Sequence, residues 1–153
     1  MDIKHLKSIF RRDLTRLKQE LEAYRNESAI WETANEINNS AGTLGVHVIG
    51  NLNAYIGAEL GGTGYIRDRD GEFSPRRISR REIGEQIEQT IDIVEQSLDR
   101  VSESQLDEEF PVPVSGRKQT TRFMLMHLIT HLSYHLGQVS YHRRLLDNPE
   151  KIK

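Results

Sequence analysis

Three of the six histidines in this sequence, His127, His131 and His135, recur at intervals of four residues. Side chains four residues apart on a helix lie one turn above each other on the same face. Two imidazoles on adjacent turns can reach a single divalent cation, which binds histidine nitrogens at about 2.0 to 2.1 Å. The spacing therefore predicts a pair of metal ligands wherever two of these rings face the protein interior.

The apolar residues around the histidines indicate which rings face inward. With about 100° of rotation per residue, the apolar face is centred on the following positions: Leu128, Leu132, Leu136 and Val139. His135 lies nearest to this centre, His131 comes next, and His127 drifts towards the polar edge. We therefore expect His131 and His135 to be the inward pair.

A third nitrogen is offered by His47, which belongs to a separate apolar segment. His47 lies three residues after Leu44 and four before Asn51, on the flank of the apolar stripe of that segment. A buried imidazole normally needs a partner, and one ion shared by three rings would satisfy all of them. The alternative is that the histidines are exposed or hydrogen-bonded and bind no metal.

Four segments of the sequence must position these side chains. In each segment apolar residues recur every three or four positions, which is typical of one face of an amphipathic helix. The segments cover residues 3–24, 44–56, 83–101 and about 122–146, and no alternating strand pattern occurs between them. We expect an all-α fold, an up-down type of four-helix bundle with one long connection between the second and third helices. Residues 1–153 are expected to form a single domain.

Local signals predict several helix ends. Ser79 and Glu82 have the spacing of a capping box, and Thr120 or Thr121 is placed to cap the last helix. The last helix is the most apolar of the four, so we expect it to be the most deeply buried.

The composition is that of an ordinary globular protein. The chain has 153 residues, of which 36% are hydrophobic and 29% charged, and its formal net charge is only -2, so neither a nucleic-acid nor a membrane partner is indicated. It contains no cysteine, which excludes disulfides, thiolate metal sites and a cysteine nucleophile. The charged N-terminal stretch does not resemble a signal peptide, so we expect a cytoplasmic protein.

The histidine motifs also resemble a known family. The stretch His131-Leu-Ser-Tyr-His135-Leu-Gly-Gln138 resembles the closing motif of the DinB superfamily, and 45–52 looks like the second-helix segment that supplies its other metal histidine. Residues 51–58 and 65–73 are similar to a DinB-like subfamily whose function is unassigned. The resemblance implies that His47, His131 and His135 bind a divalent metal, with water in the open positions.

The resemblance also implies a chemistry for the ion. Zinc and nickel are the leading candidates, since imidazole suits both. Characterised relatives include enzymes that use bacillithiol, mycothiol or related thiols, so we expect a metal-dependent enzyme that transfers a thiol to a small molecule, or hydrolyses one. The sequence names no catalytic residue. The alternative is a non-catalytic bundle with a structural metal or a role in oligomerisation.

Several further residues have two interpretations each. Asn51 and Gln138 could orient a ligand ring or bound water, or merely bridge helices. Gly45, Gly50 and Gly137 permit either close helix packing or space beside an ion.

Two more candidate surfaces occur in the sequence. One is the connection between the second and third helices, and the other is the outer side of the last helix. Residues 61–81 carry six arginines interleaved with acids, which favours a solvated, self-neutralising loop. The alternative is a site for an anionic substrate or a partner chain. Tyr134 and Tyr141 are seven residues apart on the outer side of the last helix, where they favour a homodimer.

Overall fold

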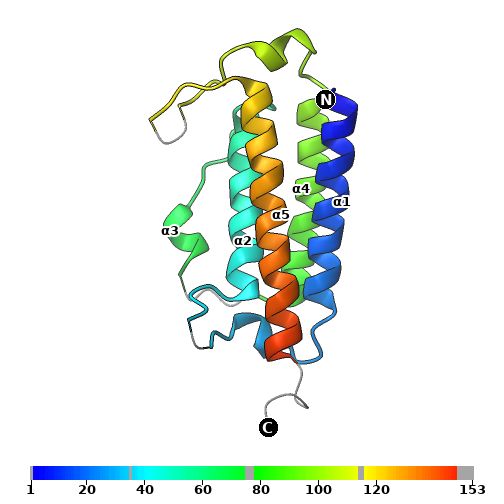
Figure 1. The fold of residues 1–153 in the computed structure, drawn as a ribbon, viewed down its shortest axis with the longest axis vertical. Helices are drawn as coiled ribbons and strands as arrows, with labels where there is room; N and C mark the ends of the chain where they lie inside the picture. Colours follow the sequence, from blue (N-terminus) through cyan, green and yellow to red (C-terminus); the bar gives the residue numbers. More distant parts are fainter. Residues whose placement is uncertain (1, 35, 75–77, 114–115, 148–153) are drawn as a thin grey trace.

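Four long helices lie side by side in the computed structural model, which describes residues 2–34, 36–74, 78–113 and 116–147 (Figure 1). They are α1 (Ile3–Glu22), α2 (Ala41–Leu52), α4 (Arg80–Leu98) and α5 (Thr121–Leu146). The shorter elements are the 3-10 helices η1 (Glu27–Trp31) and η3 (Ser104–Asp107), the π-helix η2 (Asn53–Ala58) and the helix α3 (Arg69–Glu72). Within the described residues there is no strand, only an isolated bridge between Glu109 and Thr120, so the all-α class is confirmed.

The directions of the long helices follow from the contacts between them. Contacts between α1 and α5 keep the same order along both helices: Asp13–Ser133 and Glu20–Arg143. Ion pairs between α1 and α4 run in opposite order: Lys7–Asp99, Arg11–Glu95 and Lys18–Glu88. Thus α1 and α5 are parallel to each other and antiparallel to α4.

The two middle helices are also parallel to each other. Along α2 and η2, Gly45 approaches Ile83, Asn53 hydrogen-bonds Thr90, and Gly57 approaches Ile93. The chain between them therefore returns to the end at which α2 begins, and α3 lies on this return path (Figure 1). This differs from the strict alternation of an up-down arrangement, because the long connection travels back along the helices before α4 starts.

Capping residues define the helix ends as the sequence predicts. Ser79 and Glu82 form a complete capping box at the start of α4, and the Thr120 side chain accepts a hydrogen bond from the backbone N–H of Phe123 at the start of α5. After α2 the backbone continues through the π-helix η2, which periodicity did not predict. The helical stretch ends near Gly62, whose φ of 64° lies in the left-handed region that favours glycine.

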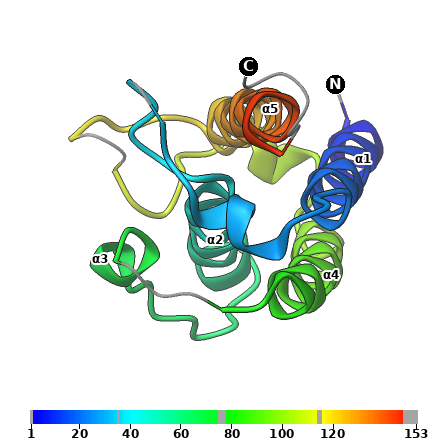
Figure 2. The same ribbon diagram turned by 90° about the horizontal axis from the view of Figure 1, so that it is seen from below.

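The core lies between the four long helices, and α2 is the most buried of them. Ten of the 12 residues of α2 are buried, compared with seven of the 26 residues of α5. The expectation that the last helix is the most deeply buried is therefore wrong. In the end-on view α5 is flanked by α1 and α2, so much of its surface faces outward (Figure 2). Its large exposed apolar side chains are Phe123, Met126, Tyr134, Tyr141 and Leu145.

Among the described residues, none of the helices combines the length and apolar character that crossing a membrane requires.

Candidate metal centre

The structure brings His47, His131 and His135 together between α2 and α5. The Nε2 atom of His131 lies 3.3 Å from Nε2 of His47 and 3.0 Å from Nε2 of His135. Potential ligand atoms of the three residues all lie within 4.8 Å of one another. His127 is exposed and its ring stands 6.1 Å from that of His131, outside this group. The inward pair predicted from helix periodicity is confirmed.

In two of the rings, the Nδ1 atom, which points away from the converging Nε2 atoms, faces a hydrogen-bond acceptor. Nδ1 of His47 lies 2.9 Å from a Glu72 carboxylate oxygen, and Nδ1 of His135 lies 2.7 Å from the Gln138 amide oxygen. An acceptor at this distance requires the proton on Nδ1, which leaves the lone pair on Nε2. Both of these Nε2 lone pairs point towards His131 Nε2, which can donate at most one proton. A cation at this point would resolve the crowding of lone pairs.

Burial keeps all three rings in the neutral form that binds metals. Desolvation lowers the pKa of His47 and of His135, although the carboxylate of Glu72 and the amide of Gln138 act in the opposite direction. Desolvation, together with the neighbouring rings of His135 and His47, lowers the pKa of His131 to about 4. At neutral pH each ring is therefore uncharged, with one nitrogen protonated and the lone pair of the other available for a metal ion.

The connection between α2 and α4 supplies a second layer around His47. Glu72, at the end of α3, is buried, and Arg67 donates to both of its carboxylate oxygens at 2.7 and 2.8 Å. The ring of Phe73 lies 5.0 Å from the ring of His47. The expectation that arginines and acids of this stretch neutralise each other holds for Arg67 and Glu72, but the expectation that they are solvated is wrong for this pair, because both side chains are largely buried. Arg76 and Arg77 lie outside the described residues.

Residues 3–152 match the sequence profile of a family described as "Protein of unknown function (DUF1572)". The chain belongs to the DUF1572 family. A search among curated proteins found no match to it.

Sequence reasoning missed Glu72 of this DUF1572 protein, and only one signal could have pointed to it. Gly50 lies on the buried α2, and a Cβ atom on Gly50 would lie 2.0 Å from the Glu72 carboxylate oxygen. A glycine one turn from a candidate ligand is therefore explained by close approach of another chain segment. The sequence alone cannot say which segment approaches.

The other predicted residues of the DUF1572 site have different surroundings. Gln138 contacts His135, as one of its two interpretations requires. Asn51 is buried one turn from His47, and its side-chain oxygen has no hydrogen-bond partner within the described structure. Gly45 packs against neighbouring apolar side chains, whereas a Cβ on Gly137 would meet nothing within 4 Å.

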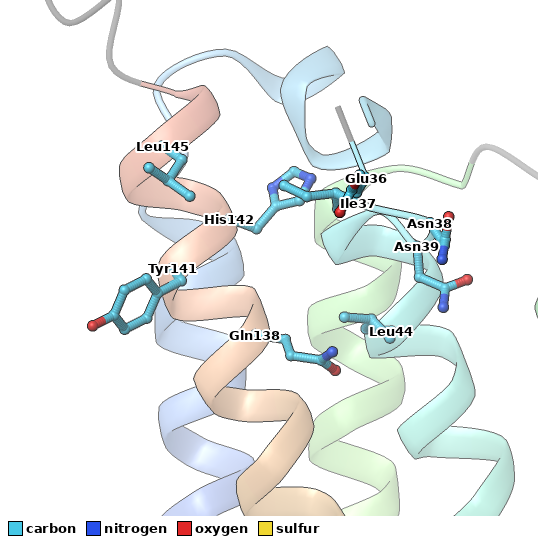
Figure 3. Close-up of a pocket in the computed structure, with 9 residues that line it drawn as sticks. All are labelled: Glu36, Ile37, Asn38, Asn39, Leu44, Gln138, Tyr141, His142 and Leu145. Carbon is cyan, nitrogen blue, oxygen red and sulfur yellow. The ribbon is translucent and has the colours of Figure 1, made fainter. Parts of the chain in front are cut away.

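A pocket of about 380 Å³ lies between α2 and α5, and one of its lining residues is Gln138, which contacts His135 (Figure 3). Leu44 and Gln138 face each other from α2 and α5, and residues 36–39 of the loop before α2 also line the pocket. His142 also lines this pocket, but both of its ring nitrogens are engaged, one by the Tyr24 hydroxyl at 2.7 Å and one by the Glu32 carbonyl at 2.8 Å. His142 therefore links α5 to Tyr24 and Glu32 of this DUF1572 chain, and it does not belong to the group formed by the three converging rings.

Proposed function

We propose that this protein is a DinB-like four-helix bundle that binds one divalent metal ion through Nε2 of His47, His131 and His135. The observation that carries the proposal is the convergence of three Nε2 atoms, two of which have their lone pairs fixed inward by Glu72 and Gln138. Helix order and the long connection between the middle helices support the likeness to the DinB superfamily.

The donor set fits zinc or nickel. Three neutral imidazoles add no charge, so a bound ion would keep its full positive field and act as a Lewis acid towards a water or thiol ligand. Within the described part of the chain, no carboxylate joins the three histidines as a fourth candidate ligand. A coordination position is thus left for an outside molecule, as catalytic sites require.

The activity we propose is thiol-dependent transfer to a small molecule, or hydrolysis of one. The chain has no cysteine, so a thiol nucleophile has to be supplied from solution. The pocket that Gln138 lines offers space for a small molecule. None of the three histidines lines this pocket, and Gln138 contacts His135 at Nδ1, whereas Nε2 of His135 faces His131. The competing proposal is a structural metal that joins α2 to α5 without catalysis.

We further propose that the protein is a homodimer formed through the outer face of α5. Five large apolar side chains are exposed on this helix. Symmetric two-fold association is the commonest way to cover such a face.

The ligand assignment is tested by two matched histidine variants. His135→Ala should abolish binding of the ion, whereas His127→Ala should retain about one ion per chain because its ring stands outside the group. Protein stripped with a chelator is reloaded and its metal content measured by mass spectrometry. Equal loss in both variants would refute the assignment.

The catalytic and structural proposals are separated by thiol titration. Cobalt-substituted protein should develop a thiolate-to-metal charge-transfer band when a low-molecular-weight thiol is added, because an open position accepts the thiolate. A cobalt spectrum that no thiol perturbs would favour the structural metal.

A further inference from the structure

Three side chains of the connection between α2 and α4 surround the ring of His47. Glu72 contacts its Nδ1 atom at 2.9 Å, Arg67 approaches the same atom at 3.4 Å, and the Phe73 ring stands 5.0 Å from the His47 ring. The neighbouring ligands His131 and His135 are held by α5 instead. His47 is thus the one of the three rings whose orientation depends on this connection.

The two contacts to His47 Nδ1 have opposite requirements. A guanidinium can only donate and needs an acceptor at Nδ1, whereas a carboxylate can only accept and needs an N–H there. The carboxylate contact is 0.5 Å shorter (3.4 less 2.9 Å) and is charge-assisted, so it determines the tautomer. Arg67 instead holds the carboxylate itself, through bonds to both of its oxygens.

The Glu72 side chain is held in this position by close packing against Gly50 of α2. The carboxylate occupies the space that a Cβ atom on Gly50 would take, and the Glu72 side chain is only 4% exposed. Arg67 also lies over the ring of Tyr55, with its guanidinium carbon 5.9 Å from the ring centroid. Glu72 therefore packs against α2, which carries His47, and Arg67 packs against η2, which continues from it.

We infer that Glu72 is a positioning residue that orients the ring of His47. Ion binding at the three histidines is then coupled to the packing of residues 67–73 against α2. The inference rests on the proposed metal site. A carboxylate bonded to the outer nitrogen of a ligand histidine fixes its ring and tautomer, and makes the inner nitrogen a better donor. Coupling is reciprocal, so an ion that needs His47 in this orientation also stabilises the segment that provides it.

The first test measures cobalt affinity in Glu72→Ala and Glu72→Gln. Loss of a hydrogen-bond partner behind a ligand histidine weakens metal binding by about 10- to 100-fold, and we expect this for Glu72→Ala with a smaller loss for Glu72→Gln, which keeps an acceptor oxygen. Glu20→Gln is the matched control. Glu20 is also buried and accepts a hydrogen bond from Arg143 at 2.8 Å, and its ion-pair partners among the described residues are all arginines.

The second test reads the tautomer of His47 without any metal. In ion-free protein, nitrogen NMR of the imidazole should show the proton of His47 on Nδ1 in the wild type and in Glu20→Gln. In Glu72→Ala the acceptor is gone, so the proton should move to Nε2 in a substantial fraction of molecules. A merely structural contribution of Glu72 to folding would leave this signature unchanged.

The third test follows hydrogen exchange of the backbone in residues 67–73. Added cobalt should slow exchange there in the wild type and have little effect in Glu72→Ala, because the link to His47 is broken. Unchanged affinity in Glu72→Gln and Glu72→Ala, or an unchanged His47 tautomer, overturns the inference while leaving the metal site in place. A wild-type protein that binds no cobalt overturns the proposed function, and the coupling with it.

Discussion

Gly50 shows how one missing methyl group determines the surroundings of a candidate ligand. A Cβ at this position would lie 2.0 Å from the Glu72 carboxylate, which is fixed by Arg67 on one side and His47 on the other. Gly137 is the contrasting case, since a Cβ there would meet nothing within 4 Å. Two glycines in the two helices that carry the ligands thus have opposite roles.

Gly50→Ala should destabilise the protein by about 1–3 kcal/mol, because the buried carboxylate must leave its hydrogen-bond partners. It should also weaken cobalt binding through His47. Gly137→Ala should instead stabilise α5 by about 0.4–1 kcal/mol, the usual gain when a helical glycine is replaced without a clash. Urea unfolding of both variants measures the difference, and a neutral Gly50→Ala would contradict the packing described for Glu72.

His142 makes the folded state sensitive to acid. The ring is buried, and desolvation lowers its pKa, with the hydrogen bond to the Glu32 carbonyl acting in the opposite direction. The unfolded chain, with a histidine pKa of about 6.5, therefore binds a proton more readily than the folded one. The free energy of unfolding must then fall as the pH decreases below this value.

His142→Gln should lower the free energy of unfolding at pH 7.5 by about 1–3 kcal/mol, since Tyr24 and the Glu32 carbonyl lose their partner. Below about pH 6.5 the difference in free energy of unfolding between the variant and the wild type should become smaller. Only the wild type is destabilised there by protonation of this histidine in the unfolded chain. His127→Gln, at an exposed ring, is the control and should change the free energy of unfolding at pH 7.5 by less than about 0.5 kcal/mol. Urea unfolding between pH 7.5 and 5 would contradict this if the His142→Gln difference were independent of pH.

At the scale of the elements, α4 depends on its first turn. The Ser79 side chain accepts from the backbone N–H of Glu82 at 3.2 Å, and the Glu82 carboxylate accepts from the backbone N–H of Ser79 at 2.8 Å. This capping box fixes where α4 begins after the long connection. It therefore also fixes where the connection ends.

Ser79→Ala should reduce the free energy of unfolding by about 1 kcal/mol, the usual effect of removing an N-cap side chain. Ser8→Ala, at an exposed position within α1, should change it by less than about 0.5 kcal/mol. Thermal and urea unfolding of the two variants give the comparison. Equal effects would mean that the cap contributes nothing specific.

At the scale of the whole molecule, the outer face of α5 governs the proposed association. Light scattering at micromolar concentration should give twice the chain mass of 17.7 kDa. Tyr141→Glu should shift the protein to monomer by placing a charge on this face, whereas Ile66→Glu should not, although Ile66 is 90% exposed. A wild-type monomer would count against the homodimer.

The sequence alone was sufficient where the information is local. Periodic apolar residues predicted the four long helices, and capping residues predicted the starts of α4 and α5. The same periodicity distinguished the inward rings of His131 and His135 from the exposed His127, because the face on which a helical side chain lies follows from its position in the turn. Local geometry needs no knowledge of the rest of the chain.

The tertiary structure decided what depends on distant segments. Glu72 lies in a connection with no periodicity, 25 residues from His47, and only the return path of that connection brings the two together. The same path makes α2 and α4 parallel. The burial of α5 was overestimated because apolar composition does not show how many neighbours a helix has. A sequence pattern tells which face of an element is apolar, whereas packing determines what that face meets.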